Sequence, residues 1–192
     1  MRILQVSPFT AYPPTRGGQS RVHGLLAGRD DRDMTIRLAV GNLEERGETV
    51  HIDRNYVEER VASYFNSLLG VLTGWIGAGQ VYADLGLRLS KISRLKELVN
   101  WAEIVMIEFP WYISYVAQLA DTETPLVYSS HNFEPEFYAR LSDRTVTVPA
   151  ARRVRRMERT AIKTADLVVT TTEHDADRYQ SAFDTGTKFH VA

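Results

Sequence analysis

Short apolar segments alternate with amphipathic helical patterns along the whole chain, and this alternation restricts the fold more than any other feature. The segments 103–108 and 166–170 are almost continuously apolar, which is typical of parallel strands that are covered on both faces. Parallel neighbours need crossover connections, and the intervening helical patterns can supply them. We therefore predict an α/β three-layer sandwich, in which a mostly parallel sheet has helices on both faces.

The same patterns give an expected order of elements. Strands are predicted at 3–7, 34–40, 49–53, 103–108, 126–129, 166–170 and 188–191. Helices are predicted from about residue 19, at 57–76, 84–100, 111–119, 133–141 and 149–164, and again from residue 173. No repeat, low-complexity tract or linker interrupts the series, so residues 1–192 are expected to form a single domain.

Composition excludes several classes of partner and site. The chain has 192 residues, and its 23 Lys and Arg against 24 Asp and Glu leave a net charge of −1. We therefore expect no nucleic-acid partner, and we expect the arginine-rich helix at 149–164 to present its basic side chains to solvent. The sequence contains no cysteine, which excludes disulfides and thiolate metal sites.

The segment 61–83 carries no charged side chain. Glycine and polar residues dilute its apolar character too far for a membrane-spanning helix. Two interpretations stay open: its apolar side packs in the core of the domain, or it lies against a membrane or an apolar acceptor. Because the first apolar run is also too short for a signal peptide, we expect a cytoplasmic protein, either free or peripheral to a membrane.

The stretch 2–29 is expected to carry a ligand site. A buried strand, a proline-rich loop, the pair Gly17-Gly18 and the start of a helix follow one another there. Glycine lets a ligand approach the backbone closely, and a helix N-terminus favours an anion such as a phosphate group. The alternative is that the two glycines only let a long loop turn into the helix.

Further candidates come from the rule that ligands bind outside the carboxyl ends of the strands in an open parallel sheet. The polar residues predicted at this edge are Ser7, Glu108, His131, Asn132, Glu134, Thr172 and Glu173. His131 is the candidate catalytic residue, because an imidazole can transfer protons or bind polar substrate groups near neutral pH. The alternatives are a structural role for His131 and helix capping by Thr172 and Glu173.

Several common site motifs are absent from the sequence. The opening loop lacks Gly-x-Gly-x-x-Gly, and neither Gly-Lys-Ser/Thr nor Gly-x-Ser-x-Gly occurs anywhere. These absences exclude the usual dinucleotide, P-loop and α/β-hydrolase sites. The other histidines have no zinc-binding spacing, and so we expect no metal ion.

Four motifs occur in order along the chain. They are the opening 2–6 with Gly17-Gly18, the run His131-Asn132-Phe133-Glu134 followed by Phe137-Tyr138, the helix with Glu158 that leads into 165–169, and the helix start at Thr172-Glu173. Together they resemble the N-terminal half of the family-4, GT-B-type retaining glycosyltransferases. The resemblance covers nearly the whole chain.

In that family, two Rossmann-like domains face each other across a cleft, and the N-terminal one mainly binds the acceptor. The resemblance implies that Gly17 and Gly18 lie near the donor phosphate or the reacting centre, and that His131 lies near the transferred sugar. It also implies metal-independent transfer with retention. No cofactor is expected, because the nucleotide-sugar is a co-substrate held mainly by the C-terminal domain.

The family's donor-binding domain has no counterpart within residues 1–192. We therefore expect an acceptor-side domain that is inactive alone. Its expected partners are its own C-terminal donor domain and a sugar acceptor, which is a glycan, a lipid-linked molecule or a small molecule. The alternative is a non-catalytic α/β module that binds or senses a ligand.

Overall fold

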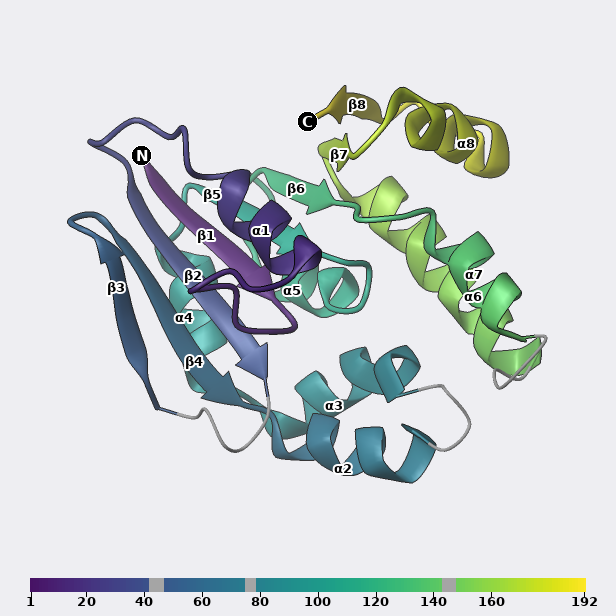
Figure 1. Ribbon diagram of the computed structural model, residues 1–192, viewed down its shortest axis with the longest axis horizontal. Coiled ribbons are helices and arrows are strands. Elements are labelled where there is room, and N and C mark those ends of the chain that lie inside the picture. The colour runs from purple at the N-terminus through teal and green to yellow at the C-terminus, as the bar shows by residue number, and fades with distance from the viewer. Residues whose placement is uncertain (42–46, 75–78, 143–147) are drawn as a thin grey trace.

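The structure of the protein is a computed structural model that describes residues 1–41, 47–74, 79–142 and 148–192. The strands are β1 (Arg2–Ser7), β2 (Met34–Gly41), β3 (Thr49–Asp53), β4 (Tyr56–Ala62), β5 (Ile104–Glu108), β6 (Leu126–Ser129), β7 (Leu167–Thr170) and β8 (Lys188–Val191). Within the described ranges they form one sheet in the order β3-β4-β2-β1-β5-β6-β7-β8 (Figure 1). The paired strands are parallel except β3 and β4, which are antiparallel.

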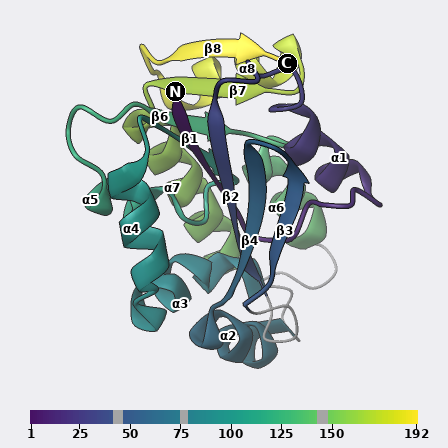
Figure 2. The same cartoon turned by 90° about the vertical axis from the view of Figure 1, so that its left-hand side faces the viewer.

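The described helices are α1 (Gly17–Gly24), α2 (Tyr64–Gly74), α3 (Ala83–Ser90), α4 (Ser93–Trp101), α5 (Ile113–Leu119), α6 (Glu134–Ser142), α7 (Val148–Thr164) and α8 (Glu173–Phe183), with a 3₁₀ helix, η2, at Gly79–Tyr82. Figure 2 shows α4 and α5 on one side of the sheet and α1 on the other. The predicted α/β sandwich with a mostly parallel, Rossmann-like sheet is therefore confirmed.

The main hydrophobic core lies between the sheet and the helices α4, α5, α7 and α8. Leu4 and Val6 of β1 face this core, and both are fully buried. A smaller cluster on the α1 side of the sheet contains Ile3, Leu26 and Tyr56. Because successive residues of a strand point to opposite faces, β1 contributes to both layers and lies at the centre of the domain.

Two predicted helices differ from the structure. The expected helix at 57–76 is wrong in its first part, because β4 occupies that part and α2 starts only at Tyr64. Parallel pairing of β4 with β2 decides this conformation, and such long-range pairing leaves no local signal in the sequence. The expected helix at 84–100 is two helices, since α3 ends at Ser90 and its C-cap, Lys91, has a left-handed φ of 45°.

The helix α2 lies at the end of the sheet to which β2 and β4 point (Figure 1). It packs closely against α3: a Cβ added to Gly86 would lie 1.9 Å from Oδ1 of Asn66 and 2.8 Å from its backbone nitrogen. The large apolar side chains exposed on α2 include Phe65, Leu68 and Val71. α2 thus uses only part of its apolar surface for packing within the domain.

The core interpretation of segment 61–83 therefore holds for one part only. Val81 and Ala83 are buried in the main core, whereas Leu68 and Val71 are 53% and 78% exposed. Residues 75 and 76, the last two of the expected helix at 57–76, lie outside the described residues. Among the described helices, none is both long enough and apolar enough to cross a bilayer.

Candidate functional site

Glu108 and His131 meet at the carboxyl end of the sheet. Glu108 is the last residue of β5 and pairs in register with Ser129 of β6, so that His131 follows at the same edge. Nε2 of His131 lies 2.8 Å from Oε2 of Glu108, which accepts its hydrogen. Glu108 is fully buried and His131 is 9% exposed. The contact fixes the orientation and the tautomer of the imidazole, because only an Nε2-protonated ring can donate there.

Phe109 places an aromatic ring against this imidazole. Its φ is 66°, in the left-handed region that bulky residues rarely adopt. The ring stacks on His131 with centroids 4.1 Å apart and planes 13° from parallel. Phe9, from the loop between β1 and α1, meets the Phe109 ring edge-on at 5.8 Å. Strained backbone of this kind clusters at functional sites, so Phe109 is a second indication of a site at this edge.

A buried polar network lies behind Glu108 on the α1 side of the sheet. Nε2 of Gln5 donates to Oε1 of Glu108 at 2.6 Å and to the backbone oxygen of Val22 in α1 at 2.9 Å. Oε1 of Gln5 accepts from Nε of Arg37 at 2.9 Å. The Glu108 carboxylate is therefore held from both sides, by Gln5 and by His131.

The network continues across β2 and β4. Arg37 pairs in register with Gln5 on one side and Glu58 on the other. Its NH1 lies 2.9 Å from Oε2 of Glu58, and both side chains are fully buried. Burial lowers the pKa of Arg37, and its hydrogen bond to Glu58 opposes this. Nε of Arg60 and the amide of Ala11 also donate to Glu58, so polar groups link β4 and the opening loop to the site.

Sequence reasoning missed Gln5, Arg37 and Glu58. The available signal was Gln5, because a polar residue in a central apolar strand needs partners on its neighbours. The alternation in 34–40 gave no sign that the polar position Arg37 is buried. Glu58 lies in the segment that the sequence assigned to a helix.

A second buried carboxyl lies under β6. Oε1 of Glu158, on α7, accepts hydrogen bonds from the hydroxyls of Tyr128 and Tyr179. Oε2 of Glu158 has no hydrogen-bond partner in the described part of the chain. The pKa of Glu158 is raised to about 8, mainly by burial, while the hydrogen bonds from Tyr179 and Tyr128 oppose the rise. Burial also raises the pKa of Glu134, to about 7.

Asn132 and Glu134 directly follow the imidazole but differ in exposure. Asn132 is exposed, whereas Glu134, the first residue of α6, is 3% exposed. The hydroxyl of Tyr179 lies 2.7 Å from the backbone oxygen of Asn132. Of the two predicted contacts, only Asn132 presents its side chain to solvent.

Gly17 and Gly18 begin α1 and are exposed. Neither has a positive φ. A Cβ at Gly17 would meet no atom within 4 Å, and one at Gly18 would meet only the Phe9 ring, at an ordinary 3.7 Å. The described part of the chain therefore does not itself require glycine at either position. The open space leaves room for a ligand to approach the backbone amides.

The remaining predicted site residues interact with nearby backbone or lie at a helix start. Oγ of Ser7 donates to the backbone oxygen of Phe9 at 2.7 Å. Thr172 is the N-cap of α8, because its Oγ1 accepts from the amide of Asp175 at 3.0 Å. Glu173 is exposed in the first turn of the same helix. Within the described residues, none of these three predicted residues hydrogen-bonds to the imidazole or to its carboxylate partner.

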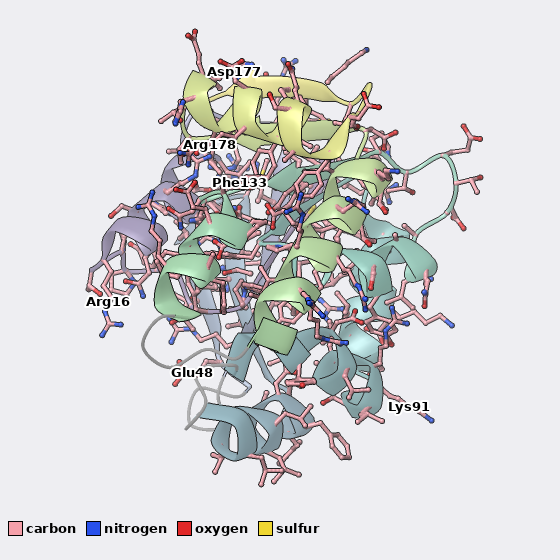
Figure 3. The ribbon with its side chains drawn as sticks, turned by 90° about the vertical axis from the view of Figure 1, so that its right-hand side faces the viewer. Arg16, Glu48, Lys91, Phe133, Asp177 and Arg178 are labelled. Atoms are coloured by element: carbon pink, nitrogen blue, oxygen red, sulfur yellow. The ribbon has the colours of Figure 1, made fainter. Side chains whose placement is uncertain are left out.

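A small hollow of about 150 Å³ opens beside Asn132. Its other lining residues include Phe133 and Arg178, which Figure 3 shows near one another beside α6 and α8. Arg178 forms an ion pair with Glu136 at 2.5 Å. The described residues contain no group of three His, Cys, Asp or Glu side chains placed to bind a metal ion.

No protein-family model and no curated protein matches the sequence. The structure resembles sucrose-phosphate synthase of Thermosynechococcus elongatus with a TM-score of 0.51 at 10% identity, covering 98% of this chain and 86% of that chain. It resembles α,α-trehalose 6-phosphate synthase of Burkholderia multivorans with a TM-score of 0.55 at 15% identity, covering 95% of this chain and 42% of that chain. The structure also resembles a UGT transferase of Siraitia grosvenorii in complex with UDP, with a TM-score of 0.54 at 11% identity, covering 100% of this chain and 50% of that chain. The α/β Rossmann-like fold of this chain thus matches part of these GT-B glycosyltransferase structures.

The GT-B likeness extends over nearly all of this chain, and at such low identity it is a likeness of fold. The chain spans most of the first of these structures but half or less of the other two.

Proposed function

We propose that this chain is the acceptor-side domain of a family-4-type GT-B glycosyltransferase, which moves a sugar from a nucleotide-sugar to an acceptor with retention. The observation that carries the proposal is the fixed imidazole of His131, held by Glu108 and stacked on Phe109 at the carboxyl edge of the sheet. The exposed start of α1 belongs to the same domain, and no atom lies within 4 Å of a Cβ built on Gly17. An oriented imidazole suits a sugar hydroxyl, and free backbone amides suit a phosphate group.

Each group then has a distinct role. His131 is the proposed catalytic residue and touches the transferred sugar, while Glu108 is a positioning residue that acts through it. The amides at Gly17 and Gly18 stabilise the donor phosphate, whose negative charge grows as its bond to the sugar breaks. Asn132, exposed next to the imidazole, is the further candidate for a contact with a sugar hydroxyl.

We further propose that the donor is held mainly by a second domain outside residues 1–192, and that residues 1–192 do not turn over alone. Two of the similar structures are at least twice as long as the region they share with this chain, which supports a two-domain enzyme. The nucleotide-sugar is then a co-substrate, and neither a cofactor nor a metal ion is required.

Replacing His131 by alanine in the full-length protein is expected to lower kcat/KM for sugar transfer by about a hundredfold or more. The measurement is transfer from a panel of nucleotide-sugars to a panel of sugar and lipid acceptors. His51→Ala is the matched control, because His51 is exposed on the opposite edge strand β3 and should leave transfer unchanged. Undiminished transfer by the His131 variant would remove this residue from the site.

A non-catalytic α/β module that binds or senses a ligand is the second candidate. It predicts that the full-length protein transfers no sugar with any donor of the panel. Residues 1–192 alone should be inactive under either proposal, and turnover by this chain alone would contradict the two-domain account.

We also propose that α2 contacts a membrane surface peripherally, because its exposed apolar side chains include Phe65, Leu68 and Val71. Leu68→Glu is expected to abolish co-flotation with phosphatidylglycerol vesicles while the melting temperature stays unchanged. Val191→Glu on β8 is the matched control, since Val191 is 40% exposed on another element. Equal flotation of wild type and the Leu68 variant would contradict the membrane contact.

A further inference from the structure

Arginine side chains line a hollow of about 450 Å³ between α5 and α7. Arg152, Arg153 and Arg156 come from α7, Ser114 comes from α5, and Asp84 of α3 closes the space. In α7, positions four apart lie on the same side, so Arg152 and Arg156 stand one turn above the other. The residues that line the hollow include neither His131 nor Glu108.

The positive charge of this hollow is not neutralised by its own lining. Oδ2 of Asp84 is paired with Nε of Arg88 at 3.0 Å, and its Oδ1 accepts from Ser114 at 3.0 Å. Within the described residues, neither Arg152 nor Arg156 has a carboxylate at ion-pair distance. Both side chains are exposed and can therefore bind an anion.

Arg153 is already oriented. Its Nε donates to the backbone oxygen of Val81 at 2.8 Å, and its guanidinium lies over the ring of Tyr82 at 5.1 Å. These contacts hold one guanidinium in place before any ligand arrives, which lowers the entropy lost on binding. Pro110 and Met157 add apolar surface to the same hollow.

We propose that this hollow binds the phosphate group of an anionic ligand, either a soluble phosphorylated molecule or a phospholipid headgroup. Guanidinium groups present parallel N–H donors that match phosphate oxygens, and three of them around one hollow supply more positive charge than a single dianion requires. His131 does not line this site, and the proposal does not depend on the proposed sugar transfer.

The test uses glycerol 3-phosphate and glycerol as soluble probes, and phosphatidylcholine vesicles with and without phosphatidic acid. We expect the protein to bind a phosphate-bearing probe and neither uncharged counterpart. The double variant Arg152→Gln/Arg156→Gln should weaken that binding by about tenfold or more. Arg155→Gln is the matched control, because Arg155 is exposed on the same helix and does not line the hollow; it should change affinity by less than about twofold.

The possible results distinguish a soluble ligand from a lipid headgroup, and both from a diffuse basic surface. Binding of glycerol 3-phosphate that the double variant loses identifies a soluble ligand, and binding confined to phosphatidic acid vesicles identifies a headgroup. Equal losses in the double variant and in Arg155→Gln would show a diffuse basic surface and overturn the proposal. Binding of neither phosphate-bearing probe would overturn it as well. All variants should keep the wild-type melting temperature, since the changed side chains are exposed.

Discussion

Replacing Arg37 by methionine is expected to lower the free energy of unfolding by about 3–5 kcal/mol. Methionine fills similar space but leaves the buried carboxylate of Glu58 without the NH1 hydrogen bond that it now accepts at 2.9 Å. It also removes the Nε donor from Gln5. The loss should appear as a lower urea midpoint with an unchanged slope, because the surface exposed on unfolding stays the same.

The control for this prediction is the same substitution in an exposed pair. Arg32 contacts Asp30 at 2.7 Å, but its side chain is 90% exposed, and so Arg32→Met should have no measurable effect. Replacing Glu58 by methionine as well should restore part of the stability lost in Arg37→Met, because the double variant no longer buries a carboxylate that has lost one of its two arginine partners. An effect at Arg37 as small as that at Arg32 would contradict a buried polar network.

Stability should fall as pH rises from about 4.5 to about 8, the window set by the ordinary and the raised pKa of Glu158. Burial disfavours its charged form, so the folded state binds more protons than the unfolded state in this window. The free energy of unfolding should decrease by about 3–5 kcal/mol across it. Urea denaturation at a series of pH values measures this change.

Glu158→Gln should flatten that profile, because an amide cannot ionise, and the variant should be more stable than wild type above pH 8. Some slope should remain at lower pH from Glu134, whose pKa of about 7 is also raised by burial. Glu173→Gln, an exposed change on α8, should keep the wild-type profile. A Glu158→Gln profile with the same slope as wild type would show that Glu158 stays charged in the folded protein.

The parallel sheet could be predicted from the sequence because strands buried on both faces leave a distinctive apolar run. This is why β5 and β7 were placed nearly to the residue. The strand β4 was missed because Val57 and Val61, four residues apart, fit a helix as well as a strand. Pairing with β2 decides between the two, and that information is spread over distant parts of the chain.

The sequence could predict at which edge of the sheet the candidate site lies, but not which side chains contact one another there. Glu108 ends one strand and His131 follows the neighbouring strand, which placed both at the carboxyl edge. Their hydrogen bond depends on strand register, which the sequence does not reveal. The left-handed backbone of Phe109 likewise has no local sequence signal, since neither proline nor glycine occupies that position.

The measurement that most directly tests the proposed site is sugar transfer by a Gly17→Leu variant of the full-length protein. The described structure has no atom within 4 Å of a Cβ at Gly17, so the free energy of unfolding should not fall. A bulky side chain in front of the α1 amides should nevertheless block the donor phosphate and lower kcat/KM by about a hundredfold or more. A stable variant with this loss is the result that we predict. A stable variant with wild-type transfer would contradict the placement of the reacting centre at this edge.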